Sequence, residues 1–464
     1  MSKDSSRRSF LKKIGATTLG ALGMPYIITG KGKGKVRYLD AEFNQKKYNA
    51  NDRINVALIG AGIMGTTDAD AALQNEGIQL VAACDLYESR LVRAKEKWGQ
   101  DVFTTMDYRE ILDRDDVDSV IIATPDFWHD TIAIDALNAG KAVYLEKPMI
   151  QYIEEGHPII QAVEETGGLL QVGSQSTSSV LNAKAKELIA EGAIGDLNFV
   201  ECYWDRQSFM GAWNYPIPPS AGPENIDWDF YLKDLPNEPY NAEKFFRWRK
   251  YRDFGTGVAG DLFVHHFSGL HFITGSLGPN RIYGTGGLRF WDDGRNVPDV
   301  MLALFDYPDT ENHPAFNLSL RVNFADGSGG GYSTRFVGSD GEINYSGGGL
   351  TLSRSPMESV PGMILDNFSE EIQEEYRQYH AEKYPRPDPS VEPPNEMTYQ
   401  VKDDMDGTAL HHKTLFDAMR GEGEIVQDAV FGLRAAAPAL AANKSHFEGQ
   451  PVHWDPENLE IVNG

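Results

Sequence analysis

Two short segments of the chain carry side chains that could move a proton. Glu146-Lys147-Pro148 follows an apolar run, and a lysine at that position could donate a hydrogen bond to a ligand oxygen and exchange a proton with it. Asp261 and His265 are four residues apart, so on a helix they share one face, where the carboxylate can orient the imidazole. Removal of a hydride from a secondary alcohol requires a base for the hydroxyl proton, and either His265 or Lys147 could serve. Taken alone, Glu146 and Lys147 would also fit a surface ion pair before a turn.

A glycine-rich turn could hold the partner of such chemistry. The run Gly60-Ala61-Gly62-Ile63-Met64-Gly65 follows the apolar stretch 54–59 and opens a segment with helical composition. In this pattern Gly60 permits the tight turn, Gly62 lets the backbone approach a pyrophosphate, and Gly65 allows close helix packing. The free amides at the start of the helix then bind the phosphates. The turn therefore predicts a dinucleotide site, with a ligand-free glycine turn as the weaker alternative.

An acidic residue completes this pattern. Asp85 lies twenty positions after Gly65, at the end of the next apolar stretch, 78–84. A carboxylate there accepts hydrogen bonds from a ribose 2′-hydroxyl and repels a 2′-phosphate, which favours NAD as the cofactor. Arg90 keeps NADP possible.

Alternating apolar strands and helices must position these groups. Strands near 117–124 and 142–145 flank a helix near 129–139, which predicts a parallel sheet covered on both faces. The carboxyl ends of such strands meet at one crevice. That crevice then receives the glycine turn, Thr124-Pro125 with His129, and Glu146-Lys147.

The second half of the chain has a different pattern. Stretches near 197–203, 300–307, 315–324 and 331–337 alternate in polarity, which indicates a mostly antiparallel open sheet. We therefore expect an α/β protein, with an N-terminal Rossmann doubly wound parallel sheet over 52–175 and a C-terminal α/β domain with a large, mostly antiparallel open sheet over 176–464. Residues 206–255 are rich in aromatic side chains that suit either a carbohydrate or internal packing. Residues 355–402 are acidic and are expected to form an arm over the surface.

The N-terminal segment has the features of a targeting sequence. Ser6-Arg7-Arg8-Ser9-Phe10-Leu11-Lys12 resembles a twin-arginine export signal, and the apolar run after it is too short to span a membrane. We expect residues 1–35 to be this signal, residues 36–51 to be a linker, and the protein to be periplasmic without a membrane span after maturation. A basic amphipathic helix in a cytoplasmic protein is the alternative.

Composition excludes several classes of partner and site. The formal net charge of −25 argues against nucleic acid and anionic membranes, because both would repel this protein. Cys84 and Cys202 are too few for a disulfide framework or a cysteine zinc site, and both lie in apolar strands. Asp261 and His265 have a spacing that a metal could use, but no second cluster completes a site, so no metal is expected. His266 and His271 are expected in the core.

Together these motifs resemble the Gfo/Idh/MocA oxidoreductases over roughly residues 52–455. The resemblance implies that Lys147 positions the reacting hydroxyl and relays its proton, that His265 is the acid/base, and that Asp261 contacts or orients substrate. It also implies that His129 and Glu146 lie near the cofactor, and that the open sheet forms a homodimer or homotetramer. Many members have a glycine where this chain has Phe263 and an aspartate where it has Ser268, which leaves the substrate open.

Three functions are compatible with this pattern. The first is an NAD(P)-dependent oxidoreductase that transfers a hydride to or from a hydroxyl carbon of a sugar, glycoside or polyol. The second is an NAD-dependent glycoside hydrolase or lyase that oxidises a sugar transiently and eliminates the aglycone. The third, a sensor without catalysis, is disfavoured by the presence of Lys147, Asp261 and His265 together.

Overall fold

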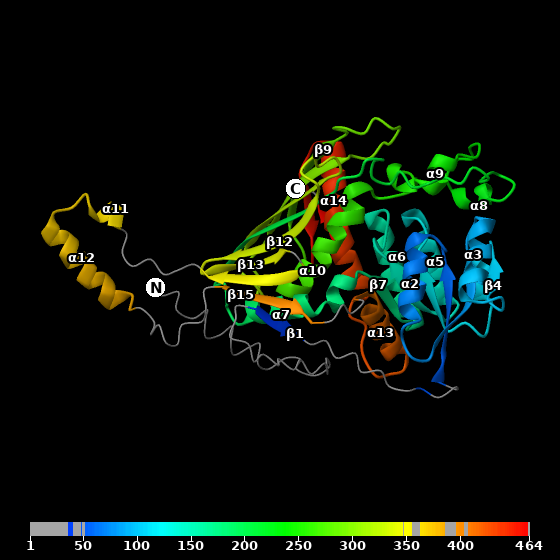
Figure 1. The fold of residues 1–464 in the computed structure, drawn as a ribbon, viewed down its shortest axis with the longest axis horizontal. Coiled ribbons are helices and arrows are strands. Elements are labelled where there is room, and N and C mark those ends of the chain that lie inside the picture. Colours follow the sequence, from blue (N-terminus) through cyan, green and yellow to red (C-terminus); the bar gives the residue numbers. More distant parts are fainter. Residues whose placement is uncertain are drawn as a thin grey trace.

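The computed structural model describes residues 36–39, 48, 52–346, 348–354, 362–385, 396–402 and 407–462 of the chain. Two sheets with their covering helices lie side by side along the long axis of the molecule (Figure 1). The predicted signal at 1–35 falls outside the described residues. Within the described part of the chain, no helix is long and apolar enough to cross a membrane.

The first sheet is a six-stranded parallel sheet with the strand order of a doubly wound fold. Its order is β4-β3-β2-β5-β6-β7. The chain therefore adds β3 and β4 on one side of β2 and then β5, β6 and β7 on the other side, which places the switch point between β2 and β5. The strands are β2 (Ile54–Ile59), β3 (Ile78–Cys84), β4 (Phe103–Thr105), β5 (Ser119–Ile122), β6 (Ala142–Glu146) and β7 (Leu170–Gly173). The helices between them are α2 (Ile63–Ala72), α3 (Glu88–Trp98), α4 (Tyr108–Leu112), α5 (His129–Asn138) and α6 (Gly156–Thr166). The predicted Rossmann sheet is confirmed.

The second sheet has eleven strands in the order β1-β15-β14-β13-β12-β8-β11-β10-β9-β16-β17. Within this sheet, only the described pairs β8 with β11 and β1 with β15 are parallel, so the predicted mostly antiparallel sheet is confirmed. Its strands are β1 (Val36–Leu39), β8 (Leu197–Asp205), β9 (Arg281–Gly287), β10 (Val300–Tyr307), β11 (Phe316–Asn323), β12 (Gly331–Gly338), β13 (Gly341–Ser346), β14 (Gly349–Arg354), β15 (Glu396–Val401), β16 (Val452–Asp455) and β17 (Glu460–Val462).

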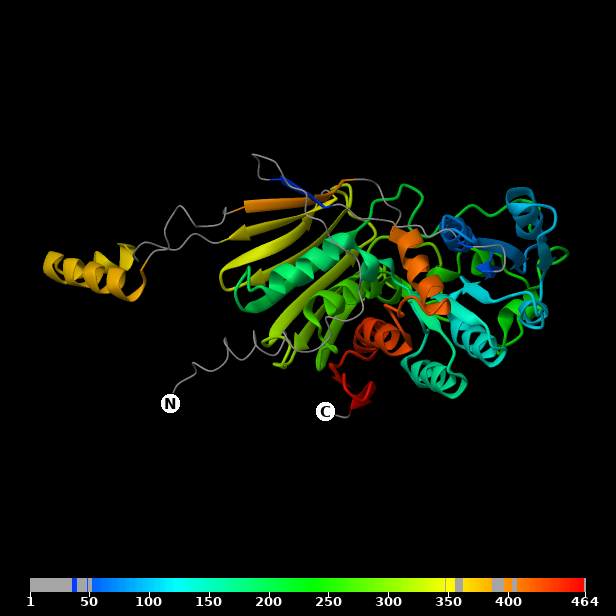
Figure 2. The same cartoon turned by 90° about the horizontal axis from the view of Figure 1, so that it is seen from below.

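Helices cover one face of this second sheet and leave the other open (Figures 1 and 2). The covering helices are α7 (Val180–Ala190), α10 (Val264–Thr274) and α14 (Ala429–Glu448). Along β10 buried and exposed residues alternate, because successive side chains of a strand point to opposite faces. Leu302, Leu304 and Tyr283 remain 45 to 60% exposed on the open face.

Chain segments remote from the Rossmann strands complete the core of the first domain. Helix α13 (Gly407–Met419) packs on α2, and its Leu415 and Phe416 lie in the same apolar cluster as Leu58 of β2. The predicted domain boundary at residue 175 therefore separates the strands of the two sheets, but the apolar core of the first domain also includes residues of α13. Of the predicted linker at 36–51, residues Val36–Leu39 instead form β1, because their backbone pairs with β15.

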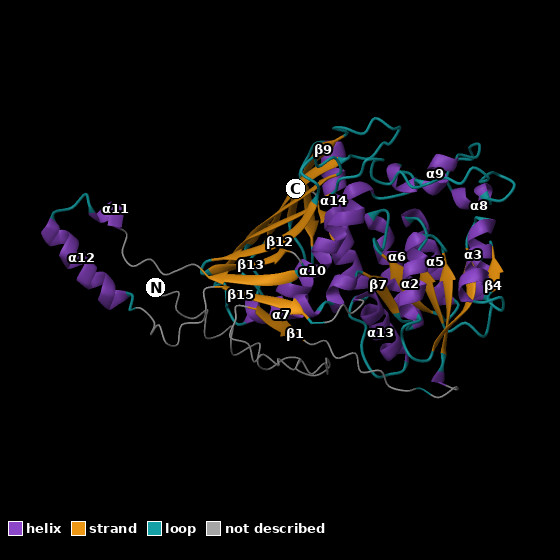
Figure 3. Cartoon of the chain, viewed as in Figure 1, coloured by secondary structure: helices purple, strands orange, loops and turns teal. Residues whose placement is uncertain are grey.

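The structure also describes the acidic segment and the aromatic segment. The expected acidic arm contains α11 (Gly362–Leu365), α12 (Glu370–Lys383) and strand β15. Helix α12 has no buried residue and lies apart from both sheets (Figures 1 and 3). Within the aromatic segment 206–255, short helices α8 (Trp228–Leu232) and α9 (Ala242–Phe246) form. Trp213, Trp228 and Tyr231 are buried there, so these aromatic residues serve internal packing.

Candidate active site

The glycine turn has the backbone geometry that its sequence predicts. Gly60 has φ +94°, and a Cβ there would lie 2.6 Å from the carbonyl oxygen of Ala123. A Cβ on Gly65 would lie 1.9 Å from the carbonyl oxygen of Gly60. At Gly62 the only atoms that an added Cβ would meet within 4 Å belong to Arg90, at 3.9 Å. The turn is therefore closed on the protein side at Gly60 and Gly65 and open at Gly62, as a pyrophosphate requires.

Donors at the start of α2 and the end of β5 are available for the dinucleotide. The first hydrogen bond of α2 runs from the Thr66 amide to the Gly62 carbonyl oxygen, so the amides of Ile63, Met64 and Gly65 precede it. The buried Oγ1 of Thr124, just after β5, has no hydrogen-bond partner among the described residues. These groups fit a phosphorylated ligand at this edge of the sheet.

Asp85 lies at the end of β3, where the ribose is expected, and is already engaged. Its carboxylate accepts hydrogen bonds from Nη1 of Arg90, at 3.2 and 3.3 Å, and from the Tyr87 amide, at 3.0 Å. The Arg90 guanidinium also lies over the rings of Phe245 and Phe246. Arg90 thus donates hydrogen bonds to the same Asp85 carboxylate that a ribose would contact.

His129 joins the ends of β5 and β6. Its Nδ1 lies 2.7 Å from the carbonyl oxygen of Pro148, and its Nε2 lies 3.1 Å from that of Thr124. Burial lowers the pKa of this imidazole despite the nearby carboxylate of Asp126. His129 is 1% exposed, so it braces the loop that carries Thr124-Pro125 against the loop that carries Lys147.

Glu146 is the last residue of β6 and is 4% exposed. Its Oε1 accepts a hydrogen bond from Nε2 of Gln175 at 3.3 Å. Burial, reinforced by the carboxylate of Asp68, raises the pKa of Glu146 well above its ordinary value. The Glu146 side chain is therefore buried, whereas the adjacent Lys147 reaches Asp261 of the second domain.

Lys147 bridges the two domains through Asp261. Its Nζ donates to Oδ1 of Asp261 at 2.8 Å and to the carbonyl oxygen of the same residue at 3.0 Å. Burial alone would raise the pKa of Asp261, but the cations of Lys147 and Arg249 hold it well below its ordinary value. Lys147 thus keeps a charged partner, and its third N–H has no acceptor among the described residues.

His265 lies in the first turn of α10, in the second domain. Its imidazole makes no hydrogen bond to any described residue, and its ring centroid lies 5.2 Å from that of Trp204. Burial, together with the Lys147 ammonium, lowers the pKa of His265 well below its ordinary value. The imidazole is therefore unprotonated at neutral pH, which is the state that a general base requires.

The relation between Asp261 and His265 differs from the expected one. Residues Ala259–Phe263 form a π-helical turn before α10, rather than part of a continuous α-helix. Asp261 directs its carboxylate to Lys147 and Arg249, because two cations attract it more strongly than a neutral imidazole. Asp261 therefore orients Lys147, whereas His265 keeps both ring nitrogens available.

Sequence reasoning missed two arginines of this site. Arg249 lies in the short helix η5 (Trp248–Lys250), and its Nε is 3.5 Å from Oδ1 of Asp261. Arg206 follows β8 and is among the cations that lower the pKa values of Asp261 and His265. Both belong to the aromatic segment that the sequence singles out, but only the fold shows which of its cations face Lys147.

The remaining histidines of α10 are structural. His266 and His271 are 3% and 2% exposed, as expected of core residues. Nδ1 of His266 lies 3.1 Å from Oγ1 of Thr334, and Nε2 of His271 lies 3.0 Å from the hydroxyl oxygen of Tyr307. Among the described residues, no group of three potential ligands is arranged to hold a metal ion. Cys84 and Cys202 are buried free thiols.

A Rossmann domain with a lysine, an aspartate and a histidine at its crevice defines a dinucleotide-dependent oxidoreductase. Residues 54–174 match the family described as "Oxidoreductase family, NAD-binding Rossmann fold", and residues 186–453 match "Oxidoreductase family, C-terminal alpha/beta domain". The chain belongs to the Gfo/Idh/MocA oxidoreductase family, and its cofactor is NAD.

Individual relatives have limited sequence identity to this chain. The alpha-N-acetylgalactosaminidase of Shewanella oneidensis is 32% identical over 178 residues, which cover 34% of this chain and 37% of that protein. The fold matches levoglucosan dehydrogenase in complex with NADH, with a TM-score of 0.61, 18% identity, and coverage of 86% of this chain and 99% of the other. It also matches the WlbA dehydrogenase from Bordetella pertussis in complex with NADH and UDP-GlcNAcA, with a TM-score of 0.61, 18% identity, and coverage of 87% and 99%.

Proposed function

We propose that this oxidoreductase transfers a hydride between NAD and a hydroxyl carbon of a sugar, glycoside or polyol. The observation that carries the proposal is the Lys147–Asp261 pair beside a neutral His265, at the carboxyl end of β6. Gly60, Gly62, Gly65, Asp85 and the amides that start α2 hold the dinucleotide in this proposal. Bound NAD supplies the hydride acceptor or donor.

The side chains of the site divide the work on the hydroxyl. In the proposal, Lys147 donates its third N–H to the hydroxyl oxygen and stabilises the negative charge that develops there. His265 accepts the hydroxyl proton, because its lowered pKa keeps it neutral. Asp261 holds Lys147 in place through the hydrogen bond that its Oδ1 accepts. In the reverse direction His265 returns the proton.

Lys147→Met tests this assignment. We expect kcat to fall by about 100-fold or more, as for the loss of a positioned proton donor, while NADH affinity is unchanged. Because Lys147→Met leaves Asp261 with a single cationic partner, the double variant Lys147→Met/Asp261→Asn serves as the fold control. Absorbance at 340 nm with a panel of sugars and polyols reports turnover. Retained turnover in either variant contradicts the proposal.

A second function is favoured by the similarity to the alpha-N-acetylgalactosaminidase. In this alternative the chain oxidises a glycoside transiently, releases the aglycone and returns the hydride. Because the match spans about a third of both chains, the activity of that relative is itself only a proposal for this protein. Release of a chromogenic aglycone without net NADH formation selects the glycosidase over the dehydrogenase.

We also propose that the protein is exported by the twin-arginine route to the periplasm and that it forms a homodimer or homotetramer. Arg7-Arg8 supports the first part, and the apolar side chains Tyr283, Leu302 and Leu304 on the open sheet face support the second. Export of a reporter fusion that is abolished by changing both arginines to lysine tests the signal. Native mass spectrometry measures the subunit number and the bound cofactor together.

A further inference from the structure

Arg249 lies at the edge of the proposed active site with most of its donors unused. Its Nε is 3.5 Å from Oδ1 of Asp261, and its guanidinium carbon lies 4.1 Å from the centre of the Trp248 ring. The side chain is 21% exposed. Apart from the contact with Asp261, its guanidinium makes no hydrogen bond to any described residue. A guanidinium has five N–H donors, so four remain for a ligand.

A second guanidinium lies nearby on the side of His265. Arg206 stacks over Trp204, with its guanidinium carbon 5.0 Å from the ring centre, and Trp204 in turn contacts the His265 ring. The side chain of Arg206 has no hydrogen bond among the described residues. Two arginines with available donors therefore border the pair formed by Lys147 and Asp261.

Cationic side chains outnumber the carboxylates that reach them at this site. The cations are Lys147, Arg249 and Arg206. Among the described residues, Asp261 is the one carboxylate within 4 Å of any of them, in a chain whose net charge is −25. Cations with unpaired donors in an acidic protein indicate a negatively charged ligand.

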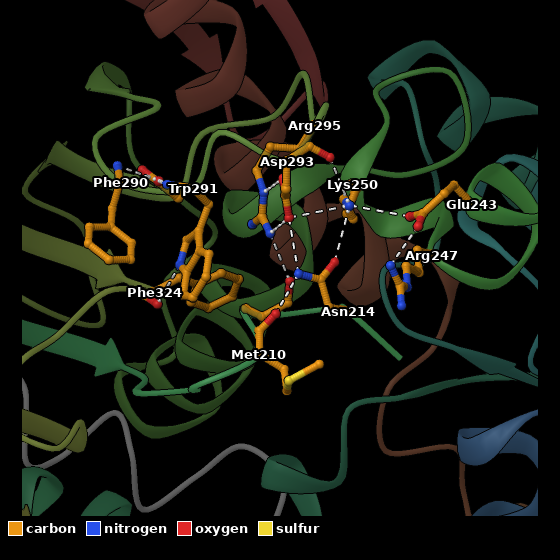
Figure 4. A network of polar contacts seen from close by, with 12 residues as sticks. Met210, Asn214, Glu243, Arg247, Lys250, Phe290, Trp291, Asp293, Arg295 and Phe324 are labelled. Carbon is orange, nitrogen blue, oxygen red and sulfur yellow. Dashed lines mark hydrogen bonds and ion pairs between the residues drawn. The ribbon is translucent and has the colours of Figure 1, made fainter. Parts of the chain in front are cut away.

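A polar network anchors Lys250, the residue that follows Arg249 (Figure 4). The next residue, Lys250, is 1% exposed, and its Nζ donates to Oδ1 of Asn214 at 3.1 Å and to the carbonyl oxygen of Asp293 at 3.2 Å. Lys250 also pairs with Glu243 at 3.4 Å, and Glu243 accepts from Arg247 at 2.6 Å. Lys250 and Arg247 are thus anchored on either side of Arg249, which constrains the backbone that carries its side chain.

We propose that Arg249, assisted by Arg206, binds a carboxylate of the substrate, so that the preferred substrate is a sugar acid or uronide rather than a neutral sugar. The planar guanidinium of Arg249 matches a carboxylate through two parallel hydrogen bonds. The glycine turn has its own amides for the pyrophosphate, so the arginines are not required for the dinucleotide. This inference rests on the proposed hydride transfer for its substrate class, but its binding site can be tested without turnover.

Matched pairs of ligands test the inference, with binding measured on the NADH-loaded protein and turnover measured with NAD+. D-glucuronate is compared with D-glucose, methyl glucuronide with methyl glucoside, and the galacto forms likewise, by calorimetric binding and by turnover. We expect at least one acid to bind about 10- to 100-fold more tightly than its neutral partner. Arg249→Gln is expected to reduce this ratio to within about threefold, and Arg249→Lys to retain part of it. Arg252→Gln, an exposed arginine that makes no contact with Asp261, is the matched control and should keep the full ratio.

The outcomes separate this inference from the proposed function. Equal binding of acid and neutral partners in every pair overturns the carboxylate site, even if neutral sugars are oxidised. Selective binding of an acid without oxidation supports the site and contradicts the proposed hydride transfer. If Arg249→Gln lowers turnover of acids and neutral sugars by the same factor, Arg249 only orients Asp261 and the inference fails. A loss of NADH affinity in Arg249→Gln also overturns it, because the arginine then serves the dinucleotide.

Discussion

We predict that Gly62→Ala weakens cofactor binding without lowering the stability of the fold. The backbone at Gly62 has φ −76° and ψ −161°, which alanine adopts without strain. The added Cβ meets only the Arg90 guanidinium, at 3.9 Å, which is ordinary contact. At such a position the replacement of glycine by alanine stabilises the fold by about 0.4 to 1 kcal/mol. The thermal midpoint should therefore remain the same or rise slightly.

The same methyl group occupies the open side of the turn, where the pyrophosphate approaches the backbone. It should weaken hydrogen bonds to a charged group, each of which contributes about 1.5 to 3 kcal/mol. The dissociation constant for NADH is then expected to rise by roughly 10- to 150-fold. Gly65→Ala differs in kind, because its Cβ would lie 1.9 Å from the Gly60 carbonyl oxygen and would displace α2. That variant should lose both affinity and stability.

Fluorescence titration of the cofactor-free protein with NADH measures the affinity for NADH, and thermal unfolding measures the stability of the fold. Gly327→Ala is the control, because an added Cβ on this exposed residue meets no atom within 4 Å. The reasoning is refuted if Gly62→Ala binds NADH as tightly as the original protein. It is also refuted if Gly62→Ala unfolds at a much lower temperature, since the loss of affinity would then not report on the turn.

Two pH effects follow from the buried histidines. Because burial lowers the pKa of His265 well below 6.5, the acid limb of kcat/KM should lie well below pH 6.5, and a limb at or above that pH excludes a buried neutral base here. Burial lowers the pKa of His266 and His271 to about 3 and of His411 to about 4, so between about pH 6.5 and pH 4 it is mainly the unfolded chain that protonates them. Their contribution to stability is complete above pH 6.5 and should decrease by roughly 4 kcal/mol per pH unit between about pH 6 and pH 4. Removal of one histidine isolates this contribution: the dependence of stability on pH in His411→Asn should differ from that of the original protein by about a third of this amount, and an identical dependence contradicts the reasoning.

Local patterns predicted the parts of the fold that depend on neighbours in sequence. The strand, glycine turn and helix from Ile54 to Ala72 were predictable because their spacing encodes backbone geometry directly. Helix α5, closed by Gly140 with φ +73°, was predictable for the same reason. The strands β13, β14, β16 and β17 were not predicted, because each has only three to six residues and is stabilised by pairing with other strands of the sheet.

The candidate site follows the same division. Lys147, Asp261 and His265 were identifiable from their motifs, but their arrangement was not. The four-residue spacing of Asp261 and His265 suggested a carboxylate-imidazole pair, and the π-helical turn with two nearby cations produced a carboxylate-lysine pair instead. Long-range electrostatics decided the partner, because a charged group selects the nearest opposite charge irrespective of sequence distance.

The sequence by itself determined that this protein has a glycine turn with the geometry of a dinucleotide site at Gly60–Gly65, and it supplied the candidate residues for proton transfer, because glycine geometry and side-chain chemistry are local properties. Only the tertiary structure decided that Lys147 and Asp261, 114 residues apart, meet across the two domains. It alone also brought Arg206 and Arg249 to the same site, since the packing that places them depends on β8, η5 and the Lys250 network together.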